Sequence, residues 1–127
     1  MRVHHIAITV KDAKTTATFY KENFGFSQIR TFTKPDWDGS ATIMQLEGMQ
    51  LEIFQFKSSI KGKDDCSNLK LIGLRHISIQ VNSVKEKYAE LKRKGIDIDK
   101  PVKGTTCAWF CFLRDPDGIP IELYEPK

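Results

Sequence analysis

The chain lacks any long apolar run, and this absence limits where it can act. No stretch approaches the roughly 20 consecutive apolar residues that a membrane-spanning helix needs, so we expect no membrane partner. The N-terminus opens with the strand-like string MRVHHIAITV, where a signal peptide would carry a basic segment before an apolar core. We therefore expect a cytoplasmic protein.

Cysteine is scarce, which argues against two further classes of protein. The three cysteines are Cys66, Cys107 and Cys111, and they form no CxxC pair. An odd number without such a pair favours neither a disulfide framework nor a thiolate zinc site. Cys107 and Cys111 would lie on one face of a strand but too far apart to bridge. We expect three small, free thiols.

Dense basic stripes are also absent, although the formal net charge is +4 and the sequence pI is about 9.0. Lysines alternate with acids, as in KDAKTT and VKEKYAELKRKG, and no nucleic-acid-binding motif is present. We expect no nucleic-acid partner. The chain has 127 residues, 40% hydrophobic and 28% charged, which suits one folded domain, residues 1–127.

The chain contains an internal repeat. HHIAITV at 4–10 resembles RHISIQV at 75–81, and GMQLEIF at 48–54 resembles GIPIELY at 118–124. A helical pattern follows the first string of each half, from Asp12 to Gly25 and from Ser83 to Gly95. We predict a first module at 1–56, an exposed connector at 57–73 that could hold a helical turn, and a second module at 74–127.

Each half is predicted to be strand, helix, strand, strand, strand. Period-2 apolar patterns and turn signals, Asp115-Pro116-Asp117-Gly118 among them, delimit the strands that follow each helix. These strands are expected at 26–34, 41–48, 49–56, 96–104, 108–115 and 119–126. The fold class is therefore α+β, with two tandem βαβββ modules.

Alternation along the strands separates four polar residues from the apolar positions beside them. Ile6 and Ile8 should face a helix while His5 faces away, and Ile77 and Ile79 bear the same relation to His76. Glu52 and Glu122 likewise alternate with buried aliphatic residues in equivalent strands. A lone His or Glu on a strand is usually an ordinary surface residue, but the recurrence of both in both halves favours a metal site.

The ligand set His5, Glu52, His76 and Glu122 suits one divalent ion, and the residue types do not distinguish Zn²⁺, Ni²⁺, Co²⁺, Mn²⁺ and Fe²⁺. Such an ion polarises a carbonyl oxygen or activates water. His4 competes with His5 for the role of ligand. Because His4 shares the aliphatic face and matches Arg75 in the repeat, we expect His5 to be the ligand.

On these strings, together with FYKENFGF at 19–26, PVKGTT at 101–106 and DPDGIPIELYEP at 115–126, the chain resembles the vicinal oxygen chelate superfamily over its whole length. This superfamily includes glyoxalase I, bleomycin-resistance proteins and extradiol dioxygenases. The resemblance is strongest to short bacterial glyoxalase I-like proteins. It implies that the two modules form a cupped, partly open barrel around the metal.

The resemblance also implies an activity. The His, Glu, His, Glu pattern is similar to that of glyoxalase I, which would make the protein a metal-dependent lyase or isomerase acting on a small carbonyl or hydroxy-carbonyl substrate. Glu122, or its counterpart Glu52, would move the proton while the metal stabilises the enediolate. One position departs from the pattern: Thr9 stands where glutathione-using members commonly carry an arginine. The identity of the substrate and the use of a thiol cosubstrate stay open.

Other functions are compatible with the same likeness. An epimerase or a thiol transferase would use the same metal site, and a binding protein of the bleomycin-resistance type would hold a small molecule without catalysis. The resemblance also implies a homodimer, with the site within one chain or shared across two. Four aromatic residues could line the substrate cavity or simply fill the core: Trp37, Phe54, Trp109 and Tyr124.

Overall fold

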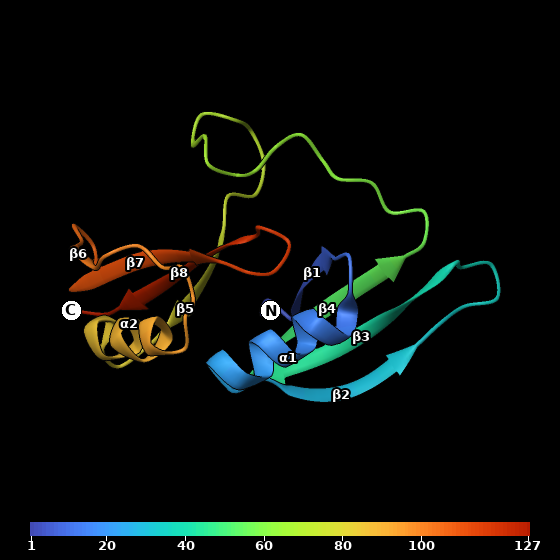
Figure 1. Ribbon diagram of the computed structural model, residues 1–127, viewed down its shortest axis with the longest axis horizontal. Coiled ribbons are helices and arrows are strands. Elements are labelled where there is room, and N and C mark those ends of the chain that lie inside the picture. The colour runs from blue at the N-terminus through green and yellow to red at the C-terminus, as the bar shows by residue number, and fades with distance from the viewer. The chain divides into compact units, whose positions relative to one another are not determined.

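The computed structural model describes all residues, 1–127, and divides into two compact units. The first module is Met1–Lys61 and the second module is Gly62–Lys127. Each contains one helix and one open sheet of four strands, and in each the helix lies along one face of its own sheet (Figure 1). The α+β class and the two βαβββ modules are therefore confirmed.

The first module follows the order β1, α1, β2, β3, β4. Its elements are β1 His5–Thr9, α1 Ala13–Phe24, β2 Ser27–Phe32, β3 Gly39–Leu46 and β4 Met49–Phe56. In space the strands lie in the order β1-β4-β3-β2, with β1 parallel to β4 and the other neighbours antiparallel. The first strand therefore lies beside the last, and the edges of the sheet are β1 and β2.

The second module repeats this arrangement. Its elements are β5 Ile77–Gln80, α2 Val84–Arg93, β6 Val102–Lys103, β7 Trp109–Arg114 and β8 Pro120–Glu125. The order in space is β5-β8-β7-β6, again with a parallel first pair and antiparallel neighbours. The internal repeat seen in the sequence is thus a repeat of topology and register.

Both helices begin at the predicted capping residues. The Oδ1 atom of Asp12 accepts a hydrogen bond from the Thr15 amide (2.9 Å), and Ser83 accepts one from the Glu86 amide (3.2 Å). Gly25 ends the first helix in the left-handed conformation, with φ 79°, which glycine adopts at little cost. A further shared contact ties each helix to its own sheet, since Ala13 N–H donates to Gln55 and Val84 N–H donates to Glu125.

The core of each module lies between its helix and one face of its sheet. In the first module Ile8, Leu51 and Ile53 are buried, and in the second Ile79, Ile121 and Leu123 are buried. These are the aliphatic positions that alternation assigned to the helix-facing side. The opposite face of each sheet carries the polar and aromatic positions of the same strands, Glu52 with Phe54 and Glu122 with Phe112 among them.

The prediction for the first strand after α2 was wrong in extent. A strand was expected over 96–104, but only Val102–Lys103 forms β6, with an isolated bridge between Ile98 and Leu113. The pairing with β7 changes register by one residue between Ile98 and Val102, and Pro101, which has no amide hydrogen to donate, lies within this irregularity. The connector 57–73 contains turns and bends and no helix.

Candidate functional site

His5 and Glu52 form a close pair in the first module. In the parallel ladder of β1 and β4, Glu52 pairs with Ala7, which lies two residues after His5 and on the same side of the strand. The Nε2 atom of His5 lies 3.6 Å from Oε2 of Glu52. The His5 side chain is 47% exposed and that of Glu52 is 19% exposed, so the pair faces outward from the core that β1 and β4 share with α1.

His76 and Glu122 form the equivalent pair in the second module. Glu122 pairs with Ser78 across β5 and β8, and Ser78 lies two residues after His76. The Nε2 atom of His76 is 3.5 Å from Oε2 of Glu122, and the side chains are 32% and 18% exposed. The same atoms, in the same register, therefore approach within the same distance in both halves of the chain.

The chemistry of these donors fits a divalent metal ion. Separations of 3.5 and 3.6 Å exceed the usual length of a hydrogen bond, and they match two donors held about 2.0–2.2 Å from one ion. Imidazole with carboxylate is a common ligand pairing for the divalent transition ions. Within each module the structure brings together one histidine and one glutamate, and no group of three or more His, Cys, Asp or Glu side chains that could hold an ion.

Aromatic side chains border both pairs. In the second module, Phe112 pairs with Glu122 across β7 and β8, and its ring meets the His76 ring edge-on, with centroids 5.2 Å apart. In the first module, Trp37 lies against Phe54 and Phe56, which share the outward face of β4 with Glu52. Each pair of ligands is thus flanked by an apolar surface on which a substrate carbon skeleton could lie.

A cavity of about 640 Å³ opens beside the second pair. His76, Glu122, Phe110 and Phe112 lie along it, with Asp97 and Asp99 at another side. The connector supplies Cys66, Ser67 and Leu69. Sequence reasoning missed these connector residues, because their polar, turn-rich composition indicates only an exposed loop.

Two arginines hold the connector against the second module. Arg75 forms an ion pair with Asp64 and donates to the Asn68 carbonyl (3.0 Å), while Arg114 donates to the carbonyls of Asp65 (2.8 Å) and Gly118. The hydrogen bond from Arg75 lowers the pKa of Asp64 below its usual value. Both arginines line the cavity, but Arg75 donates to the connector and Arg114 divides its donors between the connector and the Gly118 carbonyl.

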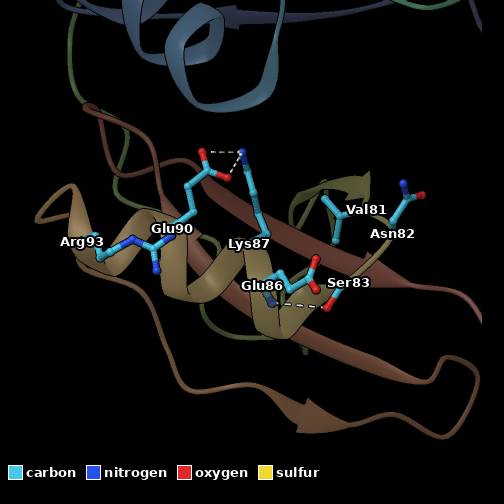
Figure 2. A pocket seen from close by; sticks show the side chains of 7 residues that line it. All are labelled: Val81, Asn82, Ser83, Glu86, Lys87, Glu90 and Arg93. Atoms are coloured by element: carbon cyan, nitrogen blue, oxygen red, sulfur yellow. Dashed lines mark hydrogen bonds and ion pairs between the residues drawn. The ribbon is translucent and has the colours of Figure 1, made fainter.

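A second hollow lies along the outer surface of α2 (Figure 2). Its volume is about 480 Å³, and Val81, Asn82 and Arg93 are among its lining residues. Lys87 and Glu90 form an ion pair there with both carboxylate oxygens 3.1 Å from Nζ. None of the four predicted ligands contributes to it, whereas His76 and Glu122 line the larger cavity.

The aromatic residues predicted as lining have different surroundings. Trp109 lies outside the cavity of the second module, with Lys85 Nζ 3.9 Å and Lys103 Nζ 5.8 Å from the centre of its ring. Tyr124 also lies outside that cavity and donates its hydroxyl to the Thr106 carbonyl. Phe110 and Phe112, on the strand that pairs with β8, line the cavity instead.

All three cysteines are free thiols. Cys107 and Cys111 are buried, and burial, with Asp99 as a second cause, raises the pKa of Cys111 to about 11. A thiol with so high a pKa is a poor nucleophile near neutral pH. Cys66 is half-buried on the connector.

Two tandem βαβββ modules, each with a parallel pair formed by its first and last strands, define the fold class of this chain. The model of the glyoxalase/bleomycin resistance protein/dioxygenase superfamily matches residues 2–123, and the chain belongs to this superfamily. The superfamily includes enzymes, and its members commonly bind a divalent metal and small-molecule substrates and often form dimers.

Several relatives align over nearly the whole chain. The uncharacterized protein YwkD of Bacillus subtilis is 31% identical, with 97% of this chain and 95% of that protein covered. Lactoylglutathione lyase of Escherichia coli O157:H7 is 28% identical over 100% of this chain and 94% of its own. Human mitochondrial methylmalonyl-CoA epimerase is 29% identical, with 96% and 72% covered.

The fold of the chain also matches solved structures. The crystal structure of a glyoxalase family protein from Enterococcus faecalis superposes with a TM-score of 0.83 and 30% identity, covering 98% of this chain and 97% of that one. Similarity over both full lengths agrees with the superfamily assignment. Neither helix of this chain is both long and apolar enough to cross a membrane.

Proposed function

We propose that the protein is a metal-dependent lyase or isomerase of the glyoxalase I type, acting on a small carbonyl or hydroxy-carbonyl compound. The observation that carries this proposal is the matched geometry of the two pairs, with His Nε2 and Glu Oε2 separated by 3.6 Å in one module and 3.5 Å in the other. Glu52 and Glu122 are both present beside the two histidines. This His, Glu, His, Glu pattern is similar to that of glyoxalase I. The similarity to lactoylglutathione lyase supports the same branch.

The four side chains His5, Glu52, His76 and Glu122 would hold one divalent ion. When bound, the ion would polarise the substrate carbonyl and make the neighbouring carbon more acidic. The carboxylates supply the remaining chemistry, because a glutamate close to the substrate can take a proton from that carbon and return it to the next. Glu122 is the better candidate for the base, since its oxygen lies at the cavity that Phe110 and Phe112 line.

Thr9 distinguishes this protein from members of the superfamily that use glutathione, which commonly carry an arginine at this position. Thr9 is exposed in β1 and carries no charge with which to pair the carboxylate of a cosubstrate. We therefore expect weaker use of glutathione than of a thiol lacking that carboxylate.

The test is metal analysis followed by turnover. Purified protein should contain about one divalent ion per chain, and the loaded protein should convert hemithioacetals of 2-oxoaldehydes made with several thiols, glutathione among them. Protein that binds no divalent ion with better than about millimolar affinity contradicts the assigned ligands.

A second reaction on the same site is favoured by a specific observation. The human epimerase relative aligns over 96% of this chain, and epimerisation also requires proton transfer next to a carbonyl. Metal-loaded protein that exchanges the carbon-bound proton of a 2-methyl thioester, while leaving hemithioacetals unchanged, would support epimerisation. Loaded protein inactive on both substrate classes would favour a small-molecule binding role. We expect a homodimer, which light scattering can test.

A further inference from the structure

His4 contacts the nitrogen of His5 that faces away from the Glu52 carboxylate. The Nδ1 atoms of the two imidazoles are 2.9 Å apart, and the rings are nearly perpendicular, at 89°, with centroids 5.2 Å apart. At that N···N distance one nitrogen must carry a proton and the other a lone pair. On the other side of the His5 ring, Nε2 faces the Glu52 carboxylate at 3.6 Å.

These two contacts determine the tautomer of a metal-bound His5. Coordination through Nε2 requires the lone pair on that atom, so the ring proton of His5 must reside on Nδ1. That proton is then donated to Nδ1 of His4, which must present its own lone pair. Histidines that bind metal ions usually donate the second ring N–H to an acceptor, and this acceptor fixes the orientation of the ring.

The backbone of His4 is itself held in place. Its carbonyl accepts a hydrogen bond of 3.1 Å from the Gln50 amide of β4, the strand that also carries Glu52. His4 is exposed, lies just before β1 and is outside the aliphatic core. The contacts given for the His4 ring are with His5, so its position is set by this neighbour and not by the core.

The second module provides a contrast at the equivalent place. Arg75 precedes His76 there, and its guanidinium is directed to Asp64 and to the connector. His76 is instead contacted by the edge of the Phe112 ring. The first module therefore uses a hydrogen-bond acceptor beside its histidine where the second uses an aromatic ring.

We infer that His4 is a positioning residue for the metal centre, which accepts the Nδ1 proton of His5 and thereby holds Nε2 toward the ion and Glu52. This inference rests on the proposed function, because it assigns His4 to the same divalent-ion site. It adds a fifth residue that acts through His5 and not by direct ligation.

The test compares Zn²⁺ affinity in matched variants by competition with a chromophoric chelator. His4→Ala should weaken Zn²⁺ binding roughly 10- to 100-fold, as loss of an outer hydrogen-bond partner commonly does. His4→Asn should restore most of the affinity, because its amide oxygen is as far along the side chain as Nδ1. His4→Gln, whose amide lies one bond farther out, should not.

Two further measurements separate positioning from direct ligation. In a His5→Ala background, His4→Ala should change Zn²⁺ affinity little, because the residue through which it acts is already gone. In the Zn²⁺-loaded wild type, ¹⁵N NMR should detect the proton on Nδ1 of His5, and its protection from exchange with solvent should fall in His4→Ala.

The outcomes distinguish this inference from the function on which it rests. Equal Zn²⁺ affinity of the wild type and the His4→Ala variant overturns the role of His4 and leaves the metal site intact. If His4→Ala lowers Zn²⁺ affinity equally in the wild-type and the His5→Ala backgrounds, His4 binds the ion directly. This result also overturns the inference. Wild-type protein without Zn²⁺ affinity overturns the metal site and the role of His4 together.

Discussion

The Nε2 atom of His76 lies 3.5 Å from the Oε2 atom of Glu122 in the second module. The separation follows from the parallel ladder of β5 and β8, which pairs Glu122 with the residue two positions after His76. The ladder of β1 and β4 sets the same relation in the first module. A duplicated βαβββ unit therefore produces two equivalent His–Glu pairs through its backbone register.

Removal of His76 should abolish most metal affinity. His76→Ala deletes one of four direct ligands, and we expect the dissociation constant for Zn²⁺ to rise by more than the roughly 10- to 100-fold expected for an outer residue. Ser78→Ala is the matched control, because Ser78 is exposed on the same side of β5 and supplies no ligand. Equal affinities of the two variants in a chelator competition would exclude His76 as a ligand.

Replacement of Glu122 by glutamine should separate catalysis from binding. Gln retains the shape and an oxygen that can still touch the ion, but it has lost the charge and basicity of the carboxylate. Turnover at saturating metal should fall roughly 10²- to 10⁴-fold, the usual cost of losing a general base, while some metal stays bound.

The same substitution at Glu52 is the control for the base. If Glu52 is only a ligand, Glu52→Gln should lose metal affinity and activity together, and excess metal should restore the rate. Full activity of Glu122→Gln at saturating metal would assign the base to Glu52 instead.

Asp12 should contribute to stability in a pH-dependent way. The hydrogen bond from the Thr15 amide lowers the pKa of Asp12 below its ordinary value of 3.8 in the folded protein. A depressed folded pKa contributes stability above the unfolded pKa, and this contribution is lost as pH falls through the folded value. Unfolding in urea at several pH values should show wild type losing stability more steeply below pH ~4 than Asp12→Asn.

Asn is the appropriate replacement because it caps a helix without titrating. Parallel pH profiles for wild type and Asp12→Asn would show that Asp12 has an ordinary pKa. Asp64 and Asp65, whose pKa values are also lowered by hydrogen bonds, remain in both proteins and contribute the same background slope.

Ser83 should stabilise α2 through its cap. Ser83→Ala removes the acceptor of the Glu86 amide, and we expect a loss of about 1 kcal/mol in the free energy of unfolding. Ser58→Ala is a suitable control, because Ser58 lies in the exposed connector and caps no helix. A loss below about 0.3 kcal/mol, measured by urea unfolding, would show that water replaces the cap without cost.

One thiol should react faster than the others in the native protein. Cys66 is half-buried, whereas Cys107 and Cys111 are buried and burial raises the pKa of Cys111 to about 11. At pH ~8 we expect a disulfide reagent to modify one thiol rapidly and three after denaturation. Cys66→Ser should remove the fast phase; its persistence would place the reactive thiol elsewhere.

Local patterns were sufficient to predict much of the fold. The spacing of apolar residues located both helices, and alternation assigned Ile53 and Leu123 to the buried face with Glu52 and Glu122 on the other. The repeated strings placed His5 and His76 in equivalent positions before the register was known. The helices and the buried faces depend on residues within a few positions of one another, which is the range over which backbone periodicity acts, whereas the match of His5 with His76 came from comparing the two repeated strings.

Other features depended on contacts between distant segments, and only the tertiary structure decided them. Arg114 binds the backbone of Asp65 far earlier in the chain and so brings the connector to the cavity. The strand expected over 96–104 is divided because Ile98 pairs with Leu113 and Val102 with Phe110, so the pairing with β7 changes register by one residue between them.

The role of His4 shows the difference most plainly. The alternation of β1 assigned His4 to the aliphatic face, but the residue lies just before the strand begins and its ring turns to His5. The sequence by itself determined which residues could bind a metal, since that depends on side-chain chemistry and strand period. The tertiary structure decided which atoms face one another, because Glu52 reaches His5 only through the pairing of β1 with β4, two segments far apart in the chain.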